Sequence, residues 1–279
     1  EAVLEFAEES LNRISLGVQS ANDDELEILG RIHTFREAEE SVRLLREAGI
    51  RNLNVDLMSA IPGQTEDSFR RSLEAVLALE PEHISVYSLI LEEGTPFYTE
   101  YAENAHPSGP ALPDEEAERR MYYETRRILG EAGYGRYEIS NYARPGYASA
   151  HNIRYWKRSD YLGFGIGASS LFEETRWTNQ PDLRTYLETD RDFSACVTEL
   201  EKLDLRSAME EFMFLGLRMT EGVSEDAFRK MFGRELGGVY GETLQKHIAA
   251  GLLVHEEDRF FLTERGMDVS NTVMADYLF

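Results

Sequence analysis

A repeat of strand and helix patterns in the first third of the chain most strongly limits what it can fold into. Apolar runs rich in β-branched residues lie at residues 13–18, 53–58 and 84–89, each followed by a helical pattern. Apolar residues at three-and-four spacing predict helices at 24–29, 36–48 and 66–79. Thr65 is placed to cap the last of these helices and Gly49 to end the second. We therefore expect parallel strands, joined by helical crossovers and buried on both faces.

Three parallel strands cannot close a barrel, although a barrel or a wider sheet is what a series of such units builds. We therefore expect further units upstream of this chain. Residues 1–11 are predicted to form a helix that begins without a start methionine or an obvious cap. Both features indicate part of a longer protein.

The remainder of the chain changes character after a turn-rich segment, PSGPALP, at residues 107–113. A charged helix with an apolar stripe is predicted next, followed by short strands and then by helices that precede a hairpin. The predicted helices are 114–133, 182–187, 206–218, 225–231 and 239–250, and the predicted strands are 134–142, 162–172, 175–178, 252–255 and 260–263. Helices followed by a hairpin indicate a winged-helix shape, so we expect three domains, at 1–106, 107–200 and 201–279.

The charge balance limits the partners of the chain. Its formal net charge is −23, and from residue 201 onward 9 Lys and Arg stand against 15 Asp and Glu, a net of −6. Phosphate contact and adsorption to an anionic membrane surface both require clustered positive charge, so we expect no nucleic-acid partner. No apolar run approaches the ~20 residues of a membrane span, and no signal peptide opens the chain. We expect a cytoplasmic protein.

Polar residues at the ends of the predicted strands are the candidates for a binding site, because barrel sites lie at the carboxyl ends of the strands. Gln19, Asp56 and Ser88 hold such places, and Arg31 opens the loop after the first helix. Asp56 lies within an otherwise apolar strand and should have hydrogen-bond donors nearby. A purely structural interpretation is also open, in which loop backbone donates hydrogen bonds to Asp56 and Arg31 is either its salt-bridge partner or solvated.

A second candidate region begins with His151, in the sequence HNIRYW, and continues into the glycine-rich stretch DYLGFGIG at 160–167. An imidazole surrounded by aromatic residues suits haem iron, which needs an axial donor in a largely apolar setting. A structural histidine, with Tyr155 and Trp156 in the core and Asn152 as a loop cap, is the alternative. No helix pattern follows the glycines, so we expect close backbone packing or pocket lining there and no phosphate loop.

These segments resemble the HemN/HemW branch of the radical S-adenosylmethionine (SAM) superfamily. The resemblance covers residues 12–272. It is carried by the segments 12–20, 29–33, 54–58 and 61–65 and by the sequence YEISNYARPG at 137–146. The HNxxYW motif at 151–156 resembles that of the HemW-type haem chaperones. It implies the second half of a partial (β/α)6 barrel, an α/β fold, with a small α+β extension and a C-terminal winged-helix-like domain. Many relatives have a histidine where this chain has Ser169, so no role of that histidine transfers.

The resemblance also implies ligands. By motif position, Gln19, Arg31 and Asp56 are implied to contact SAM, and His151 to ligate haem iron beside Tyr155 and Trp156. A guanidinium suits the methionyl carboxylate, and an amide and a carboxylate suit ribose hydroxyls or the amino group. Family members hold a 4Fe-4S cluster in a Cys-x3-Cys-x2-Cys motif near the N-terminus. This chain has one cysteine, Cys196, so the cluster is expected only in the complete protein, and this chain alone cannot run the radical reaction.

Three functions remain open from the sequence. The first is a haem chaperone that delivers haem to acceptor haemoproteins, membrane-associated ones among them. The second is an oxygen-independent coproporphyrinogen III oxidase of porphyrin biosynthesis, and the third is a cluster-free interaction module. We favour the first, because HNxxYW marks the chaperone branch of the family and the oxidases lack it.

Overall fold

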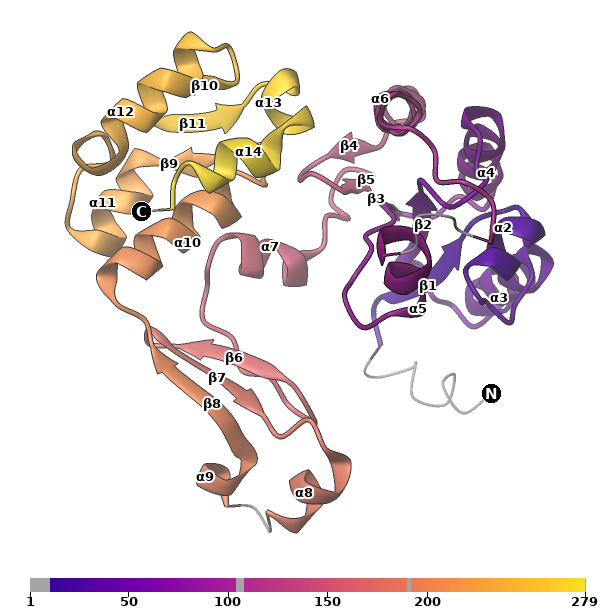
Figure 1. Cartoon of the computed structure of the whole chain (residues 1–279), viewed down its shortest axis with the longest axis horizontal. Helices are drawn as coiled ribbons and strands as arrows, with labels where there is room; N and C mark the ends of the chain where they lie inside the picture. The colour runs from indigo at the N-terminus through magenta and orange to yellow at the C-terminus, as the bar shows by residue number, and fades with distance from the viewer. Residues whose placement is uncertain (1–10, 104–107, 190–191, 279) are drawn as a thin grey trace. The chain divides into compact units, whose positions relative to one another are not determined.

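The computed structural model describes residues 11–103, 108–189 and 192–278. The chain divides into two compact units, Glu1–Ala148 and Ser149–Phe279 (Figure 1). The predicted region 107–200 is thus shared between the units, because its first strands pair with the sheet of the first unit. The helix expected at 1–11 lies almost entirely outside the described residues.

The first unit is built on one five-stranded sheet with the order β1-β2-β3-β5-β4. The strands are β1 (Ile14–Gln19), β2 (Leu53–Ser59), β3 (His83–Ser88), β4 (Gly135–Arg136) and β5 (Asn141–Ala143). The first three strands are parallel, as predicted, and β5 runs antiparallel to β3. The strand expected over 134–142 is therefore two short strands.

Four helices of the first unit follow the predicted patterns closely: α2 (Asp23–Ile28), α3 (Phe35–Glu47), α4 (Glu66–Ala78) and α6 (Glu115–Glu131). Two short helical segments, α5 (Pro96–Tyr98) and the π-helical turn η1 (Thr99–Glu103), were not among the predicted helix ranges. Thr65 caps α4 reciprocally with Ser68, as its position predicted. Gly49 follows α3 with a φ of 86°, a left-handed conformation that glycine adopts without steric cost.

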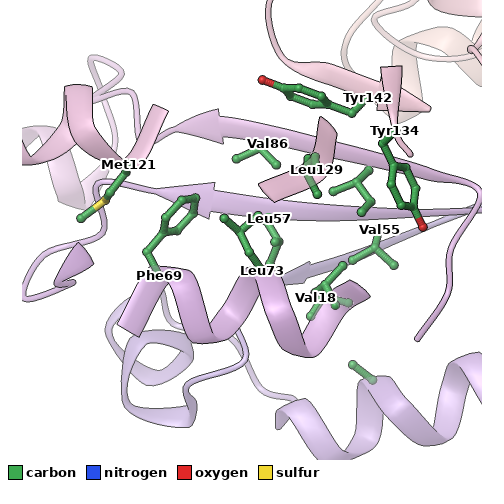
Figure 2. Packing of buried hydrophobic residues seen from close by; sticks show 13 residues of the cluster. Val18, Val55, Leu57, Phe69, Leu73, Val86, Met121, Leu129, Tyr134 and Tyr142 are labelled. Atoms are coloured by element: carbon green, nitrogen blue, oxygen red, sulfur yellow. The ribbon is translucent and has the colours of Figure 1, made fainter. Parts of the chain in front are cut away.

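The apolar core lies on one face of this sheet. Val18, Val55 and Leu57 pack there with Phe69 and Leu73 of α4, and Met121 and Leu129 of α6 join the same cluster (Figure 2). The expectation of burial on both faces holds only in part, because the alternate residues on the other face are polar: Asn54 and His83 are buried there, whereas Asp56 is half-buried. Ser15, Asn54 and His83 form one row across β1, β2 and β3, and Gly17, Asp56 and Ser85 form the next. Rows of polar side chains such as these are expected inside a barrel that receives a polar ligand.

The second unit begins with α7 and a three-stranded antiparallel sheet of order β6-β7-β8. Its first elements are α7 (Ala150–Trp156), β6 (Ser169–Phe172), β7 (Thr175–Asn179), α8 (Leu183–Glu188), α9 (Phe193–Cys196) and β8 (Val197–Lys202). Of the strand expected at 162–172, only β6 is regular. Residue 161 still pairs with this sheet through an antiparallel bridge from Tyr161 to Leu171.

The end of the second unit has the predicted winged-helix-like order, helices followed by a hairpin. Its elements are α10 (Leu205–Gly216), β9 (Val223–Ser224), α11 (Glu225–Phe232), α12 (Leu236–Ala249), β10 (Leu253–Glu256), β11 (Arg259–Leu262), α13 (Glu264–Asp268) and α14 (Ser270–Ala275). The hairpin strand β11 also pairs with β9, which makes a small three-stranded sheet. Among the described residues, no helix has the length and apolar character to cross a membrane.

Candidate functional site

The carboxyl end of β1 places Gln19 against β3. Its backbone is left-handed, with a φ of 69°, and the pairing register with β2 shifts between Gly17 and Gln19. Gln19 is 5% exposed, and its Oε1 accepts a hydrogen bond from the Tyr87 hydroxyl at 3.3 Å. Backbone held in this conformation costs energy and is enriched at ligand sites, which together with its burial makes Gln19 a candidate.

Asp56 lies on the polar face of β2 and is half-buried. Its two carboxylate oxygens accept from Asn54 Nδ2 at 2.6 Å and from Ser15 Oγ at 3.1 Å. The donors are therefore side chains of β1 and β2, and the alternative in which loop backbone satisfies Asp56 is wrong. Within the described residues Asp56 forms no ion pair, although the charge of Arg13 acts on it, so its carboxylate oxygens can still accept from a ligand.

Tyr87 connects the three predicted SAM residues, and the sequence reasoning missed it. Burial raises the pKa of Tyr87 and so does the charge of Asp56, whereas the hydrogen bond to Gln19 and the charge of Arg31 lower it. Its hydroxyl thus lies within electrostatic reach of all three. Alternation along β3 would have found Tyr87, because it follows His83 and Ser85 on the polar face.

Ser88 has the opposite alternation and belongs with Ile84 and Val86. Its hydroxyl lies 3.2 Å from that of Ser59 on the neighbouring strand. The expectation that Ser88 joins Gln19 and Asp56 is therefore wrong. Arg31 follows α2 and its side chain is exposed, as a residue that closes over a ligand would be.

The residues on this rim suit SAM chemically. They offer a carboxylate for a cationic group, a guanidinium for a carboxylate, and an amide and a phenol for hydroxyls. They do not suit an iron–sulfur cluster, because Cys196 is the single cysteine of the chain. Among the described residues, no group of three or more His, Cys, Asp and Glu side chains could hold a metal ion.

The second candidate site lies on α7, which Ser149 caps through a hydrogen bond from the backbone amide of Asn152 at 3.4 Å. Asn152 is thus within the helix, and its proposed role as a loop cap is wrong. His151 is exposed, and its ring meets that of Tyr155, one helical turn later, edge to face at 4.8 Å. Tyr155 in turn meets Tyr161 at 4.6 Å. A row of three rings therefore begins at an exposed imidazole.

Trp156 lies outside this row. The guanidinium of Arg218 is 4.4 Å from its ring centroid, a cation–π contact with the segment that follows α10. Spacing explains the difference, because residues four apart share a helix face whereas residue 156 is rotated away from residue 155. The structure brings together His151 and Tyr155 of the predicted haem residues and adds Tyr161.

The glycine-rich stretch presents apolar side chains beside Tyr161. Leu162 is 53% exposed, Phe164 87% and Ile166 48%. A Cβ atom on Gly163 would lie 2.3 Å from the carbonyl oxygen of Ser169, so the chain needs glycine there. The expectation of close backbone packing is confirmed at this position. A strand and not a helix follows, so no phosphate loop is formed.

The half barrel with its polar strand ends, together with the winged-helix-like end, defines the class of protein. A family model described as the radical SAM superfamily matches residues 1–76, and one described as the HemN C-terminal domain matches residues 203–269. The solved coproporphyrinogen III oxidase HemN of Escherichia coli, a radical SAM enzyme, superposes with a TM-score of 0.81 at 21% identity, over 99% of this chain and 66% of that one. This likeness confirms the predicted fold.

Curated relatives show which family of this class the chain belongs to. The heme chaperone HemW of Lactococcus lactis is 36% identical over 100% of this chain and 72% of its own length. The HemW of Bacillus subtilis is 36% identical over 97% and 70%, and that of Escherichia coli is 32% identical over 99% and 70%. The chain belongs to the HemW family.

Proposed function

We propose that the protein is a haem chaperone, which binds haem and passes it to acceptor haemoproteins in the cytoplasm or at a membrane. The observation that carries the proposal is the exposed His151 at the end of the ring row formed with Tyr155 and Tyr161. Relatives that share the whole chain are named heme chaperones, which supports the same function.

An exposed imidazole suits transfer better than storage. Iron ligation at His151 would need little burial of the histidine, so an acceptor protein could reach the iron and replace the ligand. The rings of Tyr155 and Tyr161 offer apolar area on one side of the histidine. The exposed Leu162, Phe164 and Ile166 extend that area along the chain, as a flat apolar cargo requires.

We also propose that Gln19, Arg31, Asp56 and Tyr87 hold SAM. When a reduced iron–sulfur cluster lies beside it, SAM supplies radical chemistry. The task of these side chains is to bind and orient it: Asp56 meets a cationic group, Arg31 an anionic one, and Gln19 and Tyr87 hold neutral groups. The cluster itself would have to be held by cysteines that this chain does not contain.

The competing reaction is that of a coproporphyrinogen III oxidase, which the HemN-like fold permits. The complete protein with its cluster reconstituted and SAM present should be supplied with coproporphyrinogen III and, separately, with haem and an apo-haemoprotein. We expect haem transfer to the acceptor and no protoporphyrinogen IX. Formation of protoporphyrinogen IX without haem transfer would reject the chaperone.

A further inference from the structure

Behind Asp56, on the same face of the sheet, lies a buried polar group for which the SAM contacts provide no task. Asn54 precedes Asp56 by two residues on β2 and is paired in register with Ser15 on β1 and His83 on β3. Asn54 is 3% exposed and His83 is fully buried, at 0%. Buried polar groups cost stability unless their hydrogen bonds are made, so this row calls for an explanation.

The amide of Asn54 uses its entire hydrogen-bonding capacity. Its Nδ2 donates to Asp56 Oδ1 and to Ser15 Oγ, each at 2.6 Å. Its Oδ1 accepts from His83 Nδ1 at 2.5 Å and from Ser85 Oγ at 3.2 Å. Two donors and two acceptor positions are thus occupied, so the amide cannot turn over without losing all of them.

The direction of these bonds fixes the state of His83. An amide oxygen only accepts, so Nδ1 of His83 carries a proton. Its Nε2 lies 2.8 Å from the Tyr137 hydroxyl and accepts from it. Burial, reinforced by the charge of Arg13, lowers the pKa of His83 to about 3, which keeps the ring neutral. One oriented chain therefore runs from Tyr137 through His83 and Asn54 to the carboxylate.

This chain holds Asp56 in place without neutralising it. Each oxygen of Asp56 accepts one bond, from Asn54 or from Ser15, and keeps further lone pairs for a ligand. A salt bridge in the same place would position the carboxylate but would also balance its charge. The donors are neutral, and the Arg13 guanidinium acts on Asp56 only through its charge, without an ion pair among the described residues. The carboxylate can therefore still meet a cationic group, such as the ammonium or sulfonium of SAM.

We propose that Asn54 and His83 are positioning residues that hold Asp56 for the cationic part of SAM, a role that rests on the proposed SAM site. Neither side chain touches the cofactor. Asn54 orients the carboxylate, and His83, in one fixed tautomer, orients Asn54. The same residues explain why an internal strand of the sheet tolerates a row of buried polar groups.

The test is SAM binding to the complete protein by titration calorimetry, with Asn54→Leu, His83→Phe and His83→Asn variants. Asn54→Leu keeps the size of the side chain but removes its amide, and should weaken SAM binding about tenfold. His83→Phe should weaken it less, and His83→Asn, which restores a donor near Nδ1, should recover most of the affinity. Wild-type affinity in both Asn54→Leu and His83→Phe would overturn the proposal.

A second measurement does not depend on any variant folding. The imidazole ¹⁵N resonances of His83 in the wild-type protein should show a neutral ring protonated at Nδ1 at pH 7. A charged ring, or one protonated at Nε2, would overturn the proposal. If wild-type protein binds no SAM at all, the proposed SAM site fails, and a neutral Nδ1–H ring would then show that the chain of hydrogen bonds stands without it.

Discussion

Asp56 in the first unit and His151 in the second are built in opposite ways. Asp56 stands on a strand of a sheet whose other face is fully packed, and two side chains hold its carboxylate. His151 stands exposed on the first turn of a seven-residue helix, supported by one ring. The contrast matches the two ligands proposed: a cofactor that must be held in one geometry, and a cargo that must leave.

The supporting structures differ as well. The first unit rests on an apolar cluster that contains Phe69, Leu73 and Met121, all fully buried. In the second unit, ion pairs anchor the residues that follow α7. The side chain of Arg158 is 2% exposed and forms ion pairs with Glu174 at 2.5 Å and with Glu211 at 2.9 Å. Arg176 meets the other oxygen of Glu211 at 2.7 Å. The ion-pair network ties α7, the β6–β7 turn and α10 together.

The largest expected effect is in the apolar cluster. Phe69→Ala removes a fully buried ring between α4 and the sheet and should lower the free energy of unfolding of the first unit by about 3 to 5 kcal/mol. Hydrogen exchange of the β1–β3 amides measures it. The control is Phe164→Ala in the second unit, which removes an exposed ring and should cost little. Equal losses would mean that the first unit does not rest on this core.

The ion-pair network comes next. Arg158→Met leaves the half-buried Glu174 and the buried Glu211 with fewer cationic partners and should cost the second unit about 3 kcal/mol in denaturant unfolding. Arg229→Met breaks an exposed pair with Asp226 and should cost less than about 1 kcal/mol. A negligible effect of Arg158→Met would show that α7 is held in place by other contacts.

A smaller effect concerns ligand binding to the first unit. Arg31→Ala should weaken SAM binding by the complete protein by one to two orders of magnitude, about 1.4 to 2.8 kcal/mol, because one charge-assisted contact is lost. The exposed Arg31 supports no described part of the fold, so unfolding should not change. Calorimetry that gives wild-type affinity would remove Arg31 from the site.

The last effect, the smallest when it is taken over a single pH unit, is the pH dependence of stability in the first unit. The folded pKa of His83, about 3, lies below its ordinary value of 6.5, so the unfolded chain binds the proton more tightly. His83 therefore stabilises the fold fully above pH 6.5, and this stabilisation is lost as pH falls toward 3, by up to about 1.4 kcal/mol per pH unit. His83→Asn should reduce the change of the unfolding free energy with pH over that range. An unchanged slope would contradict the buried neutral ring.

The sequence predicted most elements, since periodicity and caps are local properties. The three parallel strands and the helices α2, α3 and α4 appear within a residue or two of their predicted bounds, and so do α10, α11 and the hairpin. The helical pattern expected after the third strand is only the short α5. Side-chain partners were harder. Asn54 shares a strand face with Asp56, which alternation alone predicts, but its bonds to Ser15 and His83 depend on the pairing of β2 with β1 and β3, and this register is not visible in any one segment.

The helix α7 shows the other limit. The HNxxYW motif identified the region, but the prediction drawn from it placed His151, Tyr155 and Trp156 in one shared pocket. A helix separates residues 155 and 156 by rotation, so Trp156 contacts Arg218 instead. Tyr161, outside the motif, takes its place because the bridge to Leu171 brings it beside Tyr155.

A haem titration followed by the Soret spectrum, with wild-type protein and His151→Ala, tests the central claim most directly. Imidazole ligation gives a distinct band, which we expect in the wild type and not in the variant. Because His151 is exposed, its replacement should leave the fold intact, which circular dichroism checks. Identical spectra would return His151 to a structural role and contradict the proposed haem site.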